Sequence, residues 1–258
     1  EYSDALQPPN QAASFRAPPF ISSNTQILFS HHMFVQSMVC FANSRKDGRR
    51  CVAGKTWSRT DGGTWVRPVS RDPSRALLPG LLAYQDGAQP RLLDIMQVPL
   101  DSALPEGHQQ ENALTNPGYF WTKSGQVRWA DLGQWLDVPQ QLWSVNDQSR
   151  GMINNRVSTA LSVQSSLRLI RVPVLHVKLM AAPQSSDPYK HVVVGEFVYH
   201  GASYRLHVTD IDIEAQCRAH PSRNLVFTQA VLCVSLGNNF HQHYYKLIAS
   251  VLYERRFS

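Results

Sequence analysis

The side chains of this sequence that are best suited to bind a charged ligand gather between residues 39 and 70. Two tryptophans, Trp57 and Trp65, stand there among strand-forming apolar residues and several cations. The cations are Arg45, Lys46, Arg49, Arg50, Lys55, Arg59 and Arg67. Guanidinium and ammonium groups neutralise phosphates, and aromatic rings stack on nucleobases. The combination therefore predicts binding to a nucleic-acid backbone, without a chemical step.

The charge of the chain is concentrated in the same stretch. Extended to Arg75, it holds nine basic and three acidic residues. This excess equals the formal net charge of +6, so the remaining chain is about neutral. A folded, basic and aromatic surface is typical of nucleic-acid binding. The alternative, a solvated basic hairpin without a ligand, stays open because charge runs are commonly solvated faces.

Individual candidates in this stretch allow two readings each. Alternation along a strand places Trp65 and Arg67 on one face, which suits a base stacked beside a phosphate. In the alternative, Trp65 covers the end of a barrel and Arg67 pairs with a buried acid such as Asp94. Asn43 and Ser44 can read base edges or ribose hydroxyls, but such residues also satisfy turn backbones.

Signatures of catalysis and of metal binding are weak. Carboxylates at every second position from Asp210 to Glu214 have a spacing that a divalent cation could use, although helix capping explains them without metal. His241 and His243 can share a face, yet no third ligand accompanies them. The sequence has no GxSxG, P-loop or HExxH motif. We therefore expect no metal and no cofactor, and a binding protein in preference to an enzyme.

The four cysteines show neither CxxC pairing nor zinc-like spacing, so a reduced, cytoplasmic compartment is expected. A disulfide between Cys40 and Cys51 across a hairpin is the alternative, and a cysteine nucleophile at either position stays open although nothing in the sequence activates it. No apolar run approaches the ~18 residues of a membrane span, so no membrane partner is expected.

The chain divides into an opening segment and two halves. Residues 1–33 are rich in Pro, Ser, Gln and Ala without an apolar period, which indicates a flexible leader, an arm that grips a partner, or sequence added for expression. We expect a first barrel with an aromatic-rich insertion over 34–150 and a second barrel over 151–258. The 16 prolines and 14 glycines favour many turns and a β-rich fold.

Alternating apolar and polar residues between turn signals predict the strands. The first half has predicted strands at 34–42, 51–57, 64–69 and 91–100, a short helical piece at 77–84, and a loop over 101–117. The second half has predicted strands at 167–180, 191–199, 203–208, 228–236 and 245–253, and a helix that begins at Thr209 or Asp210 and ends near Ala219. This second order, with the helix between the third and fourth strands, is that of a five-stranded OB barrel. The first half reads similarly, but its closing strand is not located.

Several segments resemble the bacterial dual OB-containing domain family, over about residues 38–250. They are CFANSRK (40–46), GRRCVAG (48–54), WVRPVS (65–70), LDI (93–95), QEN (110–112), SSLRLI (165–170), HVTD (207–210), LCVSLG (232–237) and YKLIA (245–249). Two positions depart mildly from the family pattern: Phe41 stands where an aliphatic residue is expected, and Val66 replaces isoleucine.

The resemblance implies a mainly β fold of two tandem OB-like five-stranded β-barrels with short helices. It implies no settled activity, so function must be argued from the site. Five polar residues lie in the family-like segments, where inter-barrel contacts and ligand contacts explain them equally well. They are Asp94, Asn112, Arg168, Asp210 and Lys246.

The leading functional expectation is a nucleic-acid-binding module without catalysis, which contacts DNA or RNA through the phosphate backbone with the first barrel. The alternative is a protein-interaction or scaffold subunit of a larger, defence-related assembly, favoured by the Pro-rich opening segment. A third reading is recognition of a nucleotide or modified base between the barrels.

Overall fold

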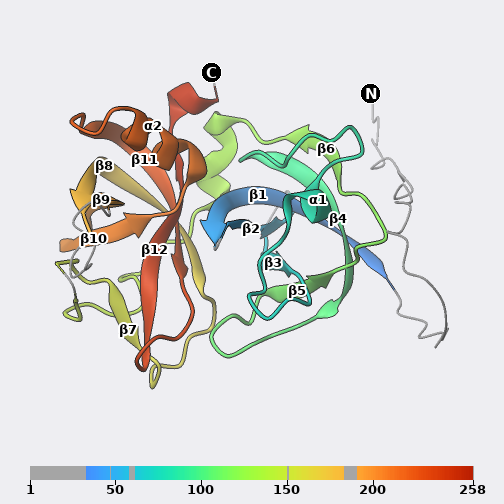
Figure 1. The fold of residues 1–258 in the computed structure, drawn as a ribbon, viewed down its shortest axis with the longest axis horizontal. Helices are drawn as coiled ribbons and strands as arrows, with labels where there is room; N and C mark the ends of the chain where they lie inside the picture. The colour runs from blue at the N-terminus through green and yellow to red at the C-terminus, as the bar shows by residue number, and fades with distance from the viewer. Residues whose placement is uncertain (1–32, 47, 58–61, 150, 183–190, 258) are drawn as a thin grey trace, which may run out of the picture.

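The structure, a computed structural model, describes residues 33–46, 48–57, 62–149, 151–182 and 191–257. The predicted leader and the candidate Arg59 lie outside the described residues. Two β-barrels lie side by side (Figure 1).

The first barrel is closed by five strands. They are β1 (Phe34–Lys46), β2 (Arg49–Thr56), β3 (Trp65–Val69), β4 (Asp94–Ala103) and β5 (Asn112–Thr115). β1 pairs with β2 and β4, β2 with β3, β3 with β5 in parallel, and β4 with β5. The missing closing strand is therefore β5, inside the segment that the sequence predicted as a loop, and that prediction was wrong.

Shorter elements complete the first half. Helix α1 (Pro79–Leu82) lies between β3 and β4, as predicted, and β6 (Thr122–Gln126) extends the sheet beside β4. The aromatic-rich part of this half contains the 3-10 helix η1 (Trp129–Trp135). Its buried residues, Leu132 and Trp135, cover one end of the first barrel's core.

The second barrel is closed by the same pattern of strand pairs as the first. Its elements are β8 (Leu167–Ala181), β9 (His191–Tyr199), β10 (Ala202–Val208), α2 (Ile211–Ala219), β11 (Leu225–Leu236) and β12 (His243–Leu252). β8 pairs with β9 and β11, β9 with β10, β10 with β12 in parallel, and β11 with β12. The predicted strand and helix order of this half is confirmed. β7 (Arg156–Ser158) pairs with β12, and η2 (Glu254–Arg256) follows β12.

Local sequence explains why these elements curve and end where they do. Gly54 lies so close to β1 that a Cβ atom there would collide with the Val39 carbonyl oxygen, so only glycine permits this tight coil of β1 and β2. Asp210 begins α2 because its carboxylate accepts hydrogen bonds from the backbone N–H groups of Asp212 and Ile213.

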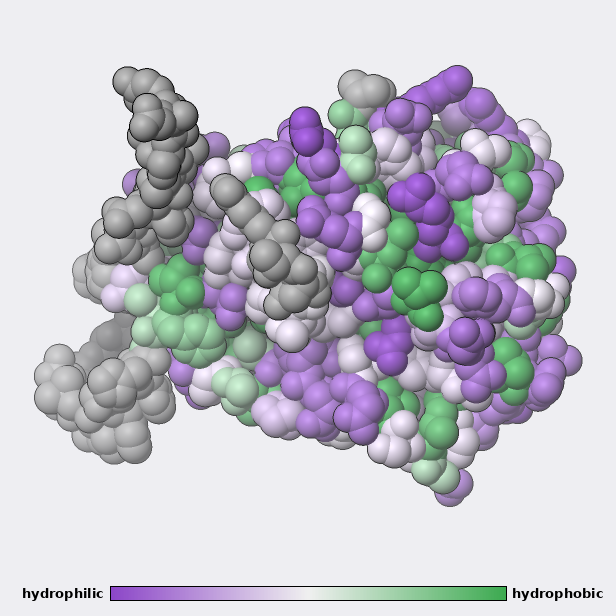
Figure 2. All heavy atoms as spheres, turned by 180° about the vertical axis from the view of Figure 1, so that it is seen from behind, coloured by the Kyte–Doolittle hydropathy of each residue, from purple (hydrophilic) through white to green (hydrophobic). Residues whose placement is uncertain are grey.

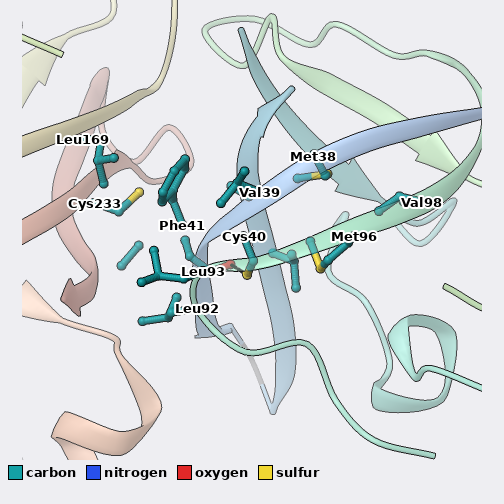
Figure 3. Close-up of a cluster of buried hydrophobic side chains, with 14 of the residues drawn as sticks. Met38, Val39, Cys40, Phe41, Leu92, Leu93, Met96, Val98, Leu169 and Cys233 are labelled. Atoms are coloured by element: carbon teal, nitrogen blue, oxygen red, sulfur yellow. Dashed lines mark hydrogen bonds between the residues drawn. The ribbon is translucent and has the colours of Figure 1, made fainter. Parts of the chain in front are cut away.

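The hydrophobic core of the first barrel continues into the second barrel, which also has a buried cluster of its own. The pairing of β1 with β2 shifts register at Phe41, which forms a bulge, and the Phe41 side chain is fully buried. Its ring lies beside Leu169 and Cys233 of the second barrel (Figure 3). Residues of both barrels thus belong to a single buried cluster.

Polar contacts reinforce this packing. The backbone N–H of Arg45 donates to the Thr209 carbonyl at 3.0 Å, which joins β1 to the start of α2. The His108 ring of the first barrel stacks on Tyr244 of the second at a centroid distance of 3.7 Å. Among the described residues, no helix is both long and apolar enough to cross a membrane.

Candidate nucleic-acid interface

Four cations form two opposed pairs at the end of the β1–β2 hairpin. Arg45 lies directly opposite Arg50, and Lys46 directly opposite Arg49. Like charges at opposed positions of an antiparallel pair destabilise the pairing. The hairpin end therefore concentrates positive charge at a cost to local stability.

Carboxylates neutralise two of these four cations. Arg45 binds Glu214 of α2 through two nitrogens, at 2.8 and 2.9 Å. Arg49 contacts Asp72 at 2.6 Å. Hydrogen bonds from Ser74, together with Arg49, hold the pKa of Asp72 below its usual value, so this carboxylate is charged at neutral pH.

The other two cations have no carboxylate partner among the described residues. The Lys46 ammonium donates to the Ser74 carbonyl at 2.7 Å and to Asn238 Oδ1 at 3.3 Å. The Arg50 side chain forms no ion pair with a described residue, while its backbone pairs with Leu77. Lys46 and Arg50 are thus the hairpin cations that can bind an external anion without first leaving a carboxylate.

Arg50 also lines a polar groove of about 900 Å³ between the barrels. The groove includes Asn43, Arg50, Arg91, Asp210, Asp212 and Arg256. Arg91 is exposed, and Asn43 donates through Nδ2 to the Pro90 carbonyl at 2.8 Å. Two cations of the first barrel therefore border one side of this groove.

Lys55 and both tryptophans of the basic stretch pack inward. Lys55 is 4% exposed, and its ammonium donates to the Trp135 carbonyl at 2.7 Å and to Asp137 at 2.8 Å. The same carboxylate accepts the Trp65 indole N–H at 3.1 Å. Trp57 stacks on Trp135 with centroids 5.7 Å apart. Lys55 and Trp65 join the barrels, and neither belongs to an open face.

Arg67 is buried between the barrels. It contacts Glu111 at 3.2 Å and donates to Ser166 Oγ of the second barrel at 2.7 Å. The alternative reading named a buried acid as its partner, and that acid is Glu111. The example offered there, Asp94, was wrong, because Asp94 instead contacts Lys123 at 2.6 Å and accepts the Tyr84 hydroxyl at 2.9 Å.

Two further candidates of the first barrel are packed into its structure. Asn112 is 1% exposed, pairs with Arg67 across β3 and β5, and donates to Gln109 Oε1 at 3.2 Å. Ser44 is 6% exposed and forms a bridge with Asp210. Both residues lie at the junction of the barrels.

The three candidates of the second barrel have separate roles. They are Asp210, Arg168 and Lys246. Asp210 caps α2 and contacts Arg256 at 2.7 Å. The Arg168 guanidinium lies over the Trp143 ring at 5.5 Å. The Lys246 ammonium donates to the carbonyls of Ser144 and Asn154, at 2.5 and 2.7 Å. Arg168 and Lys246 therefore hold the segment between the barrels against the second barrel.

The strand order of each barrel and the contacts between barrels coincide with one family description. The family model of the dual OB-containing domain matches residues 36–251. The chain belongs to the dual OB-containing domain family. The resemblance and the fold of two OB-like barrels are thereby confirmed, and comparison with curated proteins gives no match.

Several residues that matter in this dual OB chain escaped the sequence analysis. Glu111 and Asp137 bind the candidates Arg67, Lys55 and Trp65, and Arg256 binds Asp210. The family-like segment QEN contains Glu111, and this was the one available signal for it. No sequence signal marked Asp137, which follows a 3-10 helix and precedes an irregular segment.

The cysteines and histidines considered for chemistry form no reactive group. The four cysteines are free, and burial raises the pKa of the Cys40 thiol, which opposes thiolate formation. The Nδ1–H of His243 donates to the His241 carbonyl oxygen at 2.8 Å. Within the described ranges, no group of three or more His, Cys, Asp or Glu side chains could hold a metal ion.

The second barrel of this dual OB protein carries a large hollow on the outer face of β8, β9 and β10. This apolar groove of about 880 Å³ includes Val138, Val174, Val198, Tyr199, Arg171 and Arg205. Three of its valines are exposed, Val138 by 77%, Val198 by 52% and Val174 by 37%. Viewed from behind, the molecule has separate hydrophobic patches among hydrophilic side chains (Figure 2).

Lys246 gives this protein a pH-dependent stability. Burial lowers the pKa of its ammonium to about 7, far below its value in an unfolded chain. The unfolded state therefore binds more protons between pH 7 and pH 10, so this residue makes stability rise with pH in that range. From pH 7 to pH 9 we expect a gain of about 2 kcal/mol in the free energy of unfolding.

Urea unfolding of the wild type and of Lys246→Met at both pH values isolates this contribution. The variant lacks the titrating amine, so the free energy of unfolding of the wild type minus that of the variant should fall by that amount from pH 9 to pH 7. Parallel pH profiles for the two proteins would show that Lys246 does not titrate in this range.

Proposed function

We propose that this protein binds nucleic acid through the end of the β1–β2 hairpin, without a chemical step of its own. The observation that carries the proposal is the pair of like-charge cross-strand contacts, Arg45 with Arg50 and Lys46 with Arg49. Glu214 and Asp72 neutralise one cation of each pair, Arg45 and Arg49. An external polyanion would offset the charge of the other two, Lys46 and Arg50. Membership of a family built from OB barrels supports the same class of ligand.

The proposed contact is with backbone phosphates. Lys46 and Arg50 supply the free charge, and Arg91 extends it along the polar groove. Base stacking is left out of the proposal, because the rings of Trp57 and Trp65 pack against Trp135 and Phe41. Lys55 and Arg67 are likewise left out, because both are buried away from the end of the hairpin.

The test is a fluorescence-anisotropy titration with labelled single-stranded and double-stranded oligonucleotides at about 50 and 200 mM salt. The double variant Lys46→Ala, Arg50→Ala should bind more weakly at low salt. Loss of two phosphate contacts should flatten the slope of log K against log salt by about 1.4 on single strands and about 1.8 on duplexes.

Arg223→Ala is the matched control. Arg223 is an exposed arginine that forms no ion pair with any described residue and lies beyond the C-terminal end of α2, outside the polar groove. This variant has nearly the same net charge but should keep the wild-type slope. Equal slopes for wild type and the hairpin variant would overturn the proposal.

The apolar groove favours a second candidate function, a protein-interaction subunit. Exposed valines in a large concave face are typical of protein contact surfaces. The same titration separates the two candidates. Absence of binding to either oligonucleotide at low salt would leave the apolar groove as the interaction surface of this protein.

A further inference from the structure

A smaller pocket lies between the barrels, on the other side of β1 from the polar groove. This inter-barrel pocket has a volume of about 230 Å³. Ala42, Ala53 and Arg67 of the first barrel line it, together with Leu167, Ser235 and Ala249 of the second. Because both barrels supply its walls, the pocket exists only in the assembled pair.

The lining of this pocket is positively charged. Three cations contribute to it, Arg45, Lys46 and Arg67, and no carboxylate does. Glu214 and Glu111, which pair with Arg45 and Arg67, lie outside the lining. Lys46 has no carboxylate partner in the described part of the chain. The pocket therefore favours an anion.

Arg67 is held ready for such an anion. Its Nη2 contacts Glu111 and Ser166, whose side chains are almost fully buried. With respect to the described residues, its Nε and Nη1 form no hydrogen bond. Each of these two nitrogens can donate to an oxygen of a phosphate or carboxylate, while Nη2, which both two-pronged edges of the guanidinium share, is already occupied.

The other residues that line the inter-barrel pocket suit a small organic group. Leu167, Leu236 and Leu247 present apolar surface, while Ser44, Gln109 and Asn238 offer hydrogen-bonding groups. Pockets for drug-sized ligands have volumes of roughly 300–1,000 Å³, so this one suits a smaller molecule. A phosphomonoester carries about −1.5 to −2 charges and three acceptor oxygens. It can therefore accept from the Lys46 ammonium and from the free Arg67 nitrogens at once.

We propose that the inter-barrel pocket binds a phosphomonoester, with the phosphate on Arg67 and Lys46 and the body against the apolar walls. The ligand is either a free small molecule or the phosphorylated end of a nucleic-acid strand. The proposal stands independently of nucleic-acid binding at the hairpin, because the pocket requires no contact along a strand.

Thermal unfolding and phosphorus NMR of the full chain test the proposal. Inorganic phosphate, ribose 5-phosphate and adenosine 5′-monophosphate are the probes, and adenosine is the control without phosphate. Phosphate-bearing probes should raise Tm increasingly with concentration, because they bind only the native state. No rise in Tm and no phosphorus shift at millimolar concentrations of any probe would overturn the proposal.

Two variants locate the binding. Arg67→Lys keeps a charge beside Glu111 but loses the free Nε and Nη1 donors, and it should weaken binding roughly tenfold. Ser235→Leu fills the pocket without removing a cation, and it should abolish binding of all phosphate probes. Circular dichroism confirms that each variant is folded. Unchanged affinity in a folded Ser235→Leu variant would place the ligand elsewhere and overturn the assignment.

Oligonucleotides with a 5′-phosphate or a 5′-hydroxyl separate the two sources of the ligand. A strand end as ligand requires tighter binding of the phosphorylated strand and loss of that advantage in Ser235→Leu. A free small molecule as ligand requires equal binding of both strands and a response to the small probes alone. Binding of the 5′-hydroxyl strand reports only on the hairpin, so failure of either proposal is visible separately.

Discussion

Replacing Asp137 by alanine is expected to destabilise the folded protein by about 3–5 kcal/mol. Its carboxylate accepts hydrogen bonds from Lys55, from the Trp65 indole and from the backbone N–H of Leu169, all within 3.1 Å. The first two donors belong to the first barrel and the third to the second. Removal leaves the Lys55 ammonium, 4% exposed, without its counter-charge between the barrels.

Urea unfolding measures this loss, and Asp131→Ala is the matched control. Asp131 pairs with Arg128, whose side chain is 80% exposed, so its removal should leave the free energy of unfolding almost unchanged. The double variant Lys55→Met, Asp137→Leu should be more stable than Asp137→Ala, because no unpaired charge remains buried. A loss below about 1 kcal/mol for Asp137→Ala would contradict the assigned role.

Asp210→Ala is expected to be equally severe, with a loss of about 3–5 kcal/mol. Asp210 is 2% exposed and serves as the N-cap of α2. Its Oδ2 atom also accepts from the Val251 N–H at 2.8 Å and from Arg256 at 2.7 Å. The substitution removes the cap, leaves a strand N–H without its partner and leaves the Arg256 guanidinium without its buried partner.

Asp212→Ala controls for the loss of a contact with the same arginine. Asp212 contacts Arg256 at 2.6 Å, but its side chain is 69% exposed. Water replaces an exposed carboxylate well, so a loss below about 1 kcal/mol is expected. Chemical unfolding of both variants compares a buried and an exposed carboxylate on one partner. Equal losses would show that burial does not set the energetics of this contact.

The order of the second barrel was predictable because its strands are long and alternate cleanly. Its helix was equally visible, since Asp210 caps it and acidic residues fill its first turn. The closing strand of the first barrel was not predictable. β5 has only four residues, all buried, within a polar segment, so neither length nor alternation distinguishes it from a loop.

The sequence also could not predict which cations are free to bind an external anion. Nine basic residues lie close together along the sequence, but the carboxylates that pair with some of them come from distant elements. Arg45 and Glu214 are 169 residues apart, and Lys55 and Asp137 are 82 apart. Only the closed barrels bring these charges together. These long-range pairs show that part of the predicted nucleic-acid-binding face instead forms contacts inside the protein.

The shared core has a consequence for how such chains arise and change. Phe41 is buried against Leu169 and Cys233, so neither barrel has a complete surface of its own when the other is absent. Loss of the second barrel would expose that ring to water, and loss of the first would expose Leu169 and Cys233. The two barrels are therefore inherited together as one unit. The family match accordingly extends across both barrels, from residue 36 to residue 251.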